Sequence, residues 1–307
     1  MAEVVACLTQ GRVVLLQSGL EQEELRSPYA DELGARTPSV SAPVTDVSRG
    51  RRNDELCYAI SSGGLYSVFT QVNGSGRERR LFAANTEIKD LDFSFADEAL
   101  TCTVVDKNGT SAIGLLRDDG KGMRTVTEGD VLDQEPRWAP GGRAEIVYAS
   151  AGIGRTKSGA RVGVAPFSLH RLSLADSTVE VLVADAKYDY VAPVPVSQSL
   201  IYAIRRPHLA ATAQSPLRVI VAGLLAPFRK TSSQPTTPAA EANAQELVRI
   251  TDRRMEVVAS GVRAFDVSAA GVIVYSNGAG VFRISPAASL AAELITELAQ
   301  VEQIVIC

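Results

Sequence analysis

Histidine is scarce in this chain, and the spacings that usually hold a metal ion are missing. The 307 residues contain two histidines, His170 and His208, and four cysteines that lie far apart and never form a CxxC pair. A zinc site needs several cysteine or histidine ligands at short spacing. We therefore expect no metal centre, and we expect the cysteines to be buried thiols rather than a disulfide framework.

Motifs of nucleophilic and phosphate chemistry are also missing. No Gly-x-Ser-x-Gly occurs, and residues 109–114 miss it by one position. A serine hydrolase needs that elbow and a histidine base. Residues 151–159 are rich in glycine, but Thr156 precedes Lys157 where a P-loop needs glycine. This segment is expected to be a long glycine-rich loop, and the chain is expected to use no cofactor and not to be an enzyme.

An excess of positive charge is absent too, because 31 Lys and Arg face 35 Asp and Glu. Nucleic-acid binding draws most of its affinity from a basic surface, so we expect no nucleic-acid partner. No apolar run reaches the roughly 18 residues of a spanning helix, and the first residues lack the basic region of a signal peptide. We expect a cytoplasmic location, with contact at the inner face of a membrane as an open alternative.

What the sequence does have is a short strand signature that recurs. Its copies are residues 4–8, 55–59, 99–103, 145–149, 199–203 and 272–276. Their fourth positions are 7, 58, 102, 148, 202 and 275, at intervals of 51, 44, 46, 54 and 73 residues. Short strands repeating at roughly 40 to 50 residues are typical of a β-propeller with one four-stranded blade per repeat.

Hairpin signals flank each copy. Gly63-Gly64 and Asn108-Gly109 follow two of the copies, and such pairs supply the positive φ of tight turns. A fourth, closing strand is predicted in each repeat, as at 80–82, 123–127, 179–183 and 247–251. Residues 20–44 are expected to be an irregular stretch packed over the first blade.

The C-terminal residues admit two interpretations. Apolar residues of 290–301 stand at helical spacing, but residues 293–296 resemble the outer strand of the preceding repeat. We favour the strand. Residues 301–306 then form an innermost strand that pairs with the N-terminus and removes the open edges. The predicted fold is all-β: a single domain, 1–307, forming a six-bladed β-propeller of four-stranded antiparallel blades closed by pairing of the N- and C-terminal strands.

One repeat resembles a known family. Residues 135–150 read Glu-Pro-Arg-Trp-Ala-Pro-Gly-Gly-Arg-Ala-Glu-Ile-Val-Tyr-Ala-Ser. This resembles the repeat of TolB-like six-bladed β-propellers, in which a proline and an aromatic residue precede a Ser/Ala-Pro-Asp-Gly turn and a strand; Gly141 stands where the family usually has aspartate. The resemblance spans about residues 40–285. It implies the propeller fold, a bacterial source and protein partners, and it implies no reaction.

The longest interval between copies contains an insertion at 205–245. One interpretation makes residues 218–222 the third strand of blade five, followed by a long loop. The other is a short amphipathic helix that contacts a membrane surface or a partner protein. The candidate contact residues are Leu217, Ile220, Leu224, Phe228 and Arg229.

These observations favour a non-catalytic propeller scaffold for protein–protein interaction, with selectivity in residues 150–166 and 205–245. Two alternatives remain open: a ligand-binding or enzymatic propeller with its site in the central channel near the strand starts, and a regulatory subunit of a multi-protein ATPase or peptidase system. Trp138 is expected in a blade core, His170 half-buried on a strand, and His208 in a solvated loop.

Overall fold

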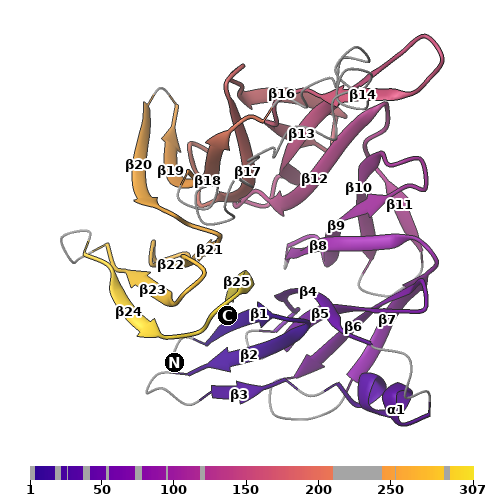
Figure 1. Ribbon diagram of the computed structural model, residues 1–307, viewed down its shortest axis with the longest axis vertical. Coiled ribbons are helices and arrows are strands. Elements are labelled where there is room, and N and C mark those ends of the chain that lie inside the picture. The colour runs from indigo at the N-terminus through magenta and orange to yellow at the C-terminus, as the bar shows by residue number, and fades with distance from the viewer. Residues whose placement is uncertain are drawn as a thin grey trace, which may run out of the picture.

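Strands dominate the computed structural model, which describes residues 4–17, 22–25, 27–36, 42–52, 55–72, 78–94, 96–117, 122–209, 244–252, 254–286 and 291–307. Sheets of mainly antiparallel strands stand around a central axis, and β4, β8, β12, β17, β21 and β25 are the strands nearest to it (Figure 1). Four of the sheets are four-stranded, and a fifth has nine strands. The two halves of the nine-stranded sheet are joined by a single parallel pairing, Ser111 with Leu132.

The strands are given from the innermost outward. The sheet that holds both chain ends contains β25 (Val301–Ile306), β1 (Val5–Thr9), β2 (Arg12–Leu16) and β3 (Gln22–Glu24). The next contains β4 (Val44–Arg49), β5 (Glu55–Ser62), β6 (Leu65–Val72) and β7 (Glu78–Ala84). The first half of the nine-stranded sheet contains β8 (Glu87–Ser94), β9 (Ala99–Val105), β10 (Ser111–Arg117) and β11 (Met123–Thr125).

The remaining groups follow the same order. The second half of the nine-stranded sheet contains β12 (Val131–Trp138), β13 (Glu145–Arg155), β15 (Ser168–Ser173) and β16 (Thr178–Val183), and β14 (Arg161–Val164) pairs with the end of β13. Then come β17 (Tyr188–Pro195), β18 (Leu200–Pro207), β19 (Glu246–Thr251) and β20 (Arg254–Ser260). The last group is β21 (Ala264–Val267), β22 (Ile273–Ser276), β23 (Val281–Ile284) and β24 (Glu293–Thr296).

The predicted repeat and its closure are confirmed. The six marker positions lie on the second strand of their groups: Cys7, Tyr58, Cys102, Tyr148, Tyr202 and Tyr275. β25 pairs antiparallel with β1, so that Val5 faces Ile306, and the Cys307 N–H donates to the Val4 carbonyl at 2.8 Å. Residues 293–296 form the outer strand β24 and not a helix, because their partners are the residues of β23.

Three local expectations were wrong. Residues 247–251 form the third strand of their sheet and not the fourth, since the adjoining segment Arg254–Ser260 pairs with them as the outer strand. Residues 151–164 form a two-stranded ribbon and not a loop, because the long β13 continues into a hairpin with β14. The stretch 20–44 contains β3 and a helix, α1 (Pro28–Arg36).

Helix α1 is held by its first turn. The Ser27 hydroxyl accepts the Ala30 N–H at 3.1 Å, and proline occupies the first helical position, as expected for a capped helix start. Tyr29 packs on Phe69 with ring centroids 4.9 Å apart, and its N–H donates to Glu78 at 2.9 Å. The Tyr58 hydroxyl donates to the same carboxylate, so α1 is tied to β5, β6 and β7.

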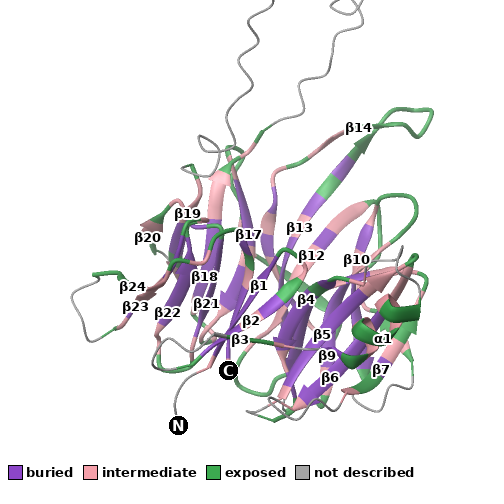
Figure 2. Cartoon of the chain, turned by 60° about the horizontal axis from the view of Figure 1, so that its bottom comes forward, coloured by how far each residue is buried: buried purple, intermediate pink, exposed green. Residues whose placement is uncertain are grey.

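The apolar cores lie between neighbouring sheets. The largest combines residues such as Ala149 and Leu169 with Tyr190 and Val191 of the next group. Figure 2 shows this burial as bands along the inner strands, with exposed residues at the outer strands and turns. Because each sheet buries both faces against its neighbours, the innermost strands are fixed relative to one another, and they line the axis of the ring.

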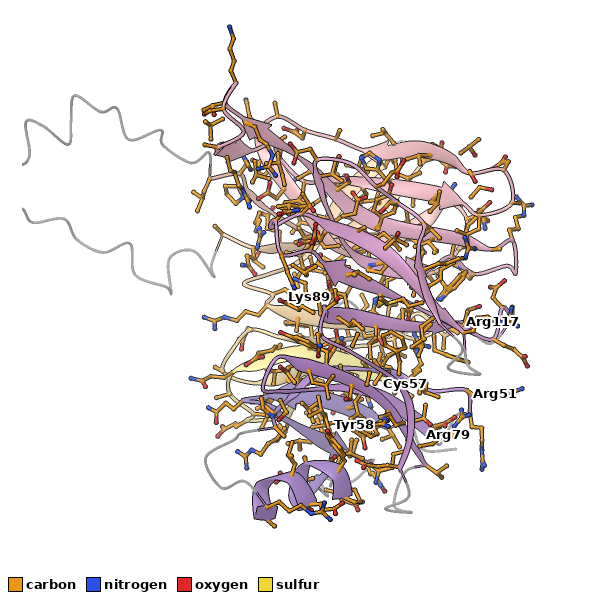
Figure 3. The ribbon with its side chains drawn as sticks, turned by 90° about the vertical axis from the view of Figure 1, so that its right-hand side faces the viewer. Arg51, Cys57, Tyr58, Arg79, Lys89 and Arg117 are labelled. Carbon is orange, nitrogen blue, oxygen red and sulfur yellow. The ribbon has the colours of Figure 1, made fainter. Side chains whose placement is uncertain are left out.

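The ring has two faces, which we name after these innermost strands. The start face is the one at which the innermost strands begin. It carries the β13–β14 ribbon, the end of β18 and the start of β19. At the end face the innermost strands finish, and it carries the turn of residues 139–144, where the TolB-like motif lies. Figure 3 labels Lys89 toward the start face and Arg51, Arg79 and Arg117 toward the end face.

The packing between β9 and β10 predicts the effect of one small substitution. A Cβ atom on Gly114 would lie 2.6 Å from Cγ2 of Val104 and 3.0 Å from Sγ of Cys102. Gly114→Ala is therefore expected to lower the free energy of unfolding by about 1–3 kcal/mol, as overpacking of a core does. Urea denaturation measures it. The matched control is Gly152→Ala, where nothing lies within 4 Å of the added atom; equal losses in both variants would contradict the packing argument.

Candidate functional site

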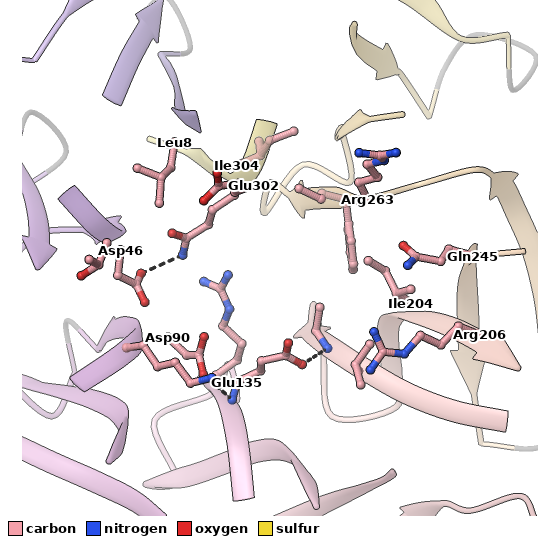
Figure 4. A pocket seen from close by; sticks show the side chains of 18 residues that line it. Leu8, Asp46, Asp90, Glu135, Ile204, Arg206, Gln245, Arg263, Glu302 and Ile304 are labelled. Atoms are coloured by element: carbon pink, nitrogen blue, oxygen red, sulfur yellow. Dashed lines mark hydrogen bonds between the residues drawn. The ribbon is translucent and has the colours of Figure 1, made fainter. Parts of the chain in front are cut away.

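A cavity of about 300 Å³ opens at the start face, around the axis of the ring. All six innermost strands line it, joined by residues of β1, of β18, and of the segments just before β19 and β21 (Figure 4). Its walls carry charged side chains of both signs. Innermost strands supply Asp46, Lys89, Asp90, Glu135, Arg137 and Glu302, while Arg206 comes from the end of β18 and Arg263 from the segment before β21. The alternative of a ligand-binding or enzymatic propeller also expects its site in the central channel.

Three successive innermost strands bulge inward at this level. Asp90, Glu135 and Ala192 have φ of 56°, 55° and 51°, in the left-handed region, and each lies at a register shift of its strand. The bulges expose backbone N–H groups to the preceding strand. The Glu135 N–H donates to the Asp90 carboxylate at 3.2 Å, and the Ala192 N–H donates to the Glu135 carboxylate at 2.5 Å.

The same series of contacts, in which a side-chain oxygen of one innermost strand accepts a backbone N–H of the next, includes the two preceding strands; we call this series the relay. The Leu91 N–H donates to Asp46 at 3.2 Å, and the Val47 N–H donates to the side-chain oxygen of Gln303 at 3.0 Å. The amide nitrogen of Gln303 in turn donates to Asp46 at 2.9 Å. From β25 to β17, each innermost strand is thus bound to the next by a side chain that accepts a backbone N–H.

Two carboxyl groups of this relay have shifted pKa values. Burial raises the pKa of Asp46 to about 7, and the charge of Asp90 acts in the same direction. Burial, again with Asp90, raises the pKa of Glu135 to about 7. Both carboxyls therefore carry less negative charge at neutral pH than free acids would.

The relay stops at Ala192, which has no carboxylate to offer the following strand. Arg206 and Gln245 reach the cavity next to it, and Arg263 lines the adjoining wall (Figure 4). Arg206 contacts Asp189 at 3.5 Å. The cavity is therefore asymmetric, with carboxylates on the strands from β25 to β12 and guanidinium and amide groups beside β17 and β21.

At the bottom of the cavity an ion pair joins two neighbouring innermost strands, β12 and β8. Arg137 contacts Asp92 at 3.3 Å, and both side chains are largely buried. Burial acts to lower the pKa of Arg137, but Asp92, Asp266 and Asp46 raise it above its ordinary value, so the guanidinium stays charged. Asp266 is fully buried, accepts the Ile306 N–H at 2.8 Å and lies 3.9 Å from Arg49.

A second cavity, of about 280 Å³, lies at the end face beyond this ion pair. Trp138 lines it, with its ring N–H donating to the Asp92 carbonyl at 3.2 Å. The side chain also packs against the core between β10 and β13, so Trp138 is half-buried and contributes both to the core and to the cavity wall. Arg49 also lines this cavity, because it is the last residue of β4.

The two histidines occupy different settings. His170 is half-buried on β15, as predicted, with Nε2 2.8 Å from the Ser168 hydroxyl. That hydroxyl also donates to the Ser150 carbonyl at 3.2 Å. His208 is not in a solvated loop: its Nδ1 lies 2.7 Å from Asp189, and its side chain is 14% exposed, because the end of β18 pairs with the start of β17.

The candidate contact residues of the insertion are not placed. Leu217, Ile220, Leu224, Phe228 and Arg229 lie outside the described residues, and so does the proposed strand 218–222. No motif in the sequence identifies the channel residues. The one signal was spacing, since Asp90 and Glu135 are separated by one repeat length.

Several further findings bear on chemistry. Over the described ranges, no group of three or more His, Cys, Asp or Glu residues is arranged to hold a metal ion, and no helix has the length and apolarity to cross a membrane. All four cysteines are free thiols. Three are buried, Cys307 is half-buried, and burial raises the pKa of Cys7 and Cys102 to about 12.

The raised pKa of Asp46 predicts a pH dependence of stability. In the unfolded chain an aspartate has a pKa of about 3.9, so the folded state binds the extra proton between pH 4 and about 7. The contribution of Asp46 to the free energy of unfolding is therefore fully present below pH 4 and is lost as the pH rises to about 7. Asp46→Asn removes this contribution, so between pH 5 and 8 the wild type is expected to lose about 2 kcal/mol more than the variant.

Urea denaturation at several pH values measures this difference. Glu256→Gln, on the exposed outer strand β20, is the matched control and should follow the wild type. Parallel profiles for the wild type and Asp46→Asn would contradict the assignment of a buried, proton-binding carboxyl to this position.

Comparisons with known proteins place this geometry in a fold group. No protein-family model matches the sequence, and no curated protein matches it significantly. Among solved structures, TolB from Acinetobacter baumannii is similar with a TM-score of 0.63 at 11% identity, over 99% of this chain and 66% of that chain. A nidogen/laminin complex gives a TM-score of 0.62 at 8% identity, over 100% of this chain and 98% of that one.

A putative TolB from Agrobacterium tumefaciens gives a TM-score of 0.56 at 11% identity, over 99% of this chain and 93% of that one. The chain thus spans just under two thirds of the Acinetobacter TolB chain and nearly all of the other two. Identities this low concern the fold alone. With its ring of antiparallel sheets and its closing pair of terminal strands, the chain has a TolB-like β-propeller fold.

Proposed function

We propose that the chain is a six-bladed, non-catalytic β-propeller that binds a protein partner through its start face. The blade count follows from treating each half of the nine-stranded sheet as one blade, since a single pairing joins them. The observation that carries the proposal is the charged mouth of the channel, which shares the start face with the β13–β14 ribbon and with the ends of the 205–245 insertion.

The ribbon supports an exposed contact surface. Val162 is 53% exposed, and the turn of the ribbon carries Lys157. Arg155 is held by Asp130, with its Nε 2.6 Å from the carboxylate, so an ion pair near the turn of the ribbon ties it to the segment before β12. A rigid ring that displays a fixed ribbon beside a charged cavity gives a partner both shape and charge to recognise.

A non-catalytic role is supported by the setting of the Ser168–His170 pair. The Ser168 hydroxyl has a second acceptor in the Ser150 carbonyl at 3.2 Å, so its single proton is not committed to His170. Asp133, which would have to orient the ring, accepts hydrogen bonds from the Ser150 and Thr127 side chains instead.

Capture from an extract of the native host tests the proposal. Lys89→Glu/Arg263→Glu is expected to reduce the captured partner at least about tenfold, because reversed charge at an interface is strongly unfavourable. Ala269→Glu, at the cavity of the end face, is the matched control and should retain the partner. Equal loss in both variants, or no loss in the first, would contradict binding through the start face.

A second arm addresses the insertion. A chain lacking 214–240 should fold and lose part of the captured partner, and neither it nor the full chain should float with liposomes. Flotation of the full chain alone would favour the membrane alternative for Leu217, Ile220, Leu224, Phe228 and Arg229 over a protein partner.

A further inference from the structure

We propose that the mouth of the channel binds a carboxylate group, held on the wall formed by Arg206, Gln245 and Arg263. The inference deepens the proposed function and rests on it in one respect: a partner that binds the start face would supply the carboxylate from one of its side chains or its chain end. The cavity itself is a property of this chain and can be tested without the partner.

The acidic groups of the cavity are already engaged. Asp46, Asp90 and Glu135 each accept a backbone N–H from the following strand, so their oxygens serve to join the blades. Of the carboxylates that line the cavity, only Glu302 forms no hydrogen bond or ion pair with the described part of the chain, and it is exposed at the rim. The acceptors inside the mouth are therefore largely satisfied.

Only some donors of the cavity are engaged: Arg137 contacts Asp92, and the Gln303 amide donates to Asp46. Within the described ranges, the side chains of Arg263, Gln245 and Lys89 form no hydrogen bond or ion pair, although all three line the cavity. Arg206 and Lys89 both lie near enough to Glu135 to oppose the rise of its pKa that burial causes. Arg206 has one long contact, to Asp189 at 3.5 Å. Unused donors beside used acceptors favour an anionic ligand.

The geometry of these donors favours a carboxylate. A guanidinium presents a planar fork of N–H groups that matches the two oxygens of a carboxylate, and an amide N–H can add a third bond. Figure 4 shows Arg206, Gln245 and Arg263 on the side of the cavity opposite Asp46 and Asp90. This wall follows Ala192, the position at which the series of carboxylates ends.

The size of the cavity limits what enters it. About 300 Å³ is the lower end for small-molecule sites, so the mouth admits one side chain or a small organic acid. The ion pair of Arg137 with Asp92 lies beneath and separates this cavity from the one at the end face. A ligand therefore enters and leaves at the start face.

Calorimetric titration of the full chain at constant ionic strength tests the site with defined probes: glutarate, the blocked peptide acetyl-Gly-Glu-Gly-amide, and its Gln counterpart. At least one of the two carboxylates is expected to bind at least about tenfold more tightly than the Gln peptide, a difference of about 1.4 kcal/mol. Tighter binding of the Glu peptide points to a polypeptide source, and tighter binding of glutarate points to a small acid.

Arg263→Gln is expected to weaken the bound carboxylate at least about tenfold. Arg249→Gln, on the exposed face of β19, is the matched control and should leave binding unchanged. Equal binding of all three probes, or equal effects of the two substitutions, would overturn the carboxylate site. If the probes bind as expected but Arg263→Gln leaves capture of the partner unchanged, the carboxylate site stands and the proposed function fails. If Arg263→Gln abolishes capture but no probe binds, the proposed function stands and the carboxylate site fails.

Discussion

A chain that ends at residue 300 is expected not to fold. The deletion removes β25, whose Val301, Ile304, Val305 and Ile306 are at most 3% exposed. Burial of one such side chain contributes about 1.5–3 kcal/mol, so the loss is comparable to the roughly 5–15 kcal/mol by which a whole domain is stable. The deletion also opens the edge of β1 to pairing with other chains. Circular dichroism and size-exclusion chromatography measure the outcome.

A permuted chain provides the control for this deletion. Because Val5 faces Ile306, residues 300–307 can be placed before residue 4 and joined to it by Asn-Gly, a pair suited to a two-residue hairpin. This chain restores every contact of β25 and should fold with nearly the stability of the wild type. A stably folded truncated chain, or a permuted chain that stays unfolded, would contradict closure of the ring by β25.

Arg137→Met is expected to lower the free energy of unfolding by about 3–5 kcal/mol, the usual cost of leaving buried charge without its partner. Asp92 and Asp266 lie near the guanidinium and are buried with it. Burial already raises the pKa of Asp92 against the opposing effect of Arg137. Without the arginine this pKa rises further, so the loss of stability should grow as the pH increases from 4 to 7.

The double variant Arg137→Met/Asp92→Asn separates charge from packing. It removes the unpaired carboxylate together with the cation, so it should recover a large part of the stability that Arg137→Met loses. Urea denaturation at neutral pH compares the two. A loss below about 1 kcal/mol in the single variant, or no recovery in the double one, would contradict the role of Arg137 as the shared counter-ion of the channel.

The fold was predictable because the repeat is a consequence of burial. Tyr58, Tyr148 and Tyr202 lie on second strands, which are covered on both faces, so these strands keep the same apolar pattern. The terminal closure followed from the surplus strand at 301–306. The order of the strands in a sheet was less predictable where two short strands follow each other. Residues 246–251 and 254–260 both have the pattern of an outer strand, and only the hairpin between them determines which one is outermost.

The channel was not predictable in its residues. Asp46 and Gln303 are in direct contact but 257 positions apart, and no local pattern joins them. Left-handed φ values at Asp90 and Glu135 occur without glycine, so the bulges leave no turn signature in the sequence. His208 was misread for a related reason: its partner Asp189 lies on the preceding strand, and the pairing buries both side chains.

Site-specific photo-crosslinking in the native host tests the central claim most directly. A photoreactive residue at Val162, on the ribbon of the start face, is compared with one at Ala269, at the cavity of the end face. We expect a discrete crosslinked partner from Val162 that is lost with Lys89→Glu/Arg263→Glu, and none from Ala269. A partner crosslinked from Ala269 and not from Val162 would contradict binding through the start face.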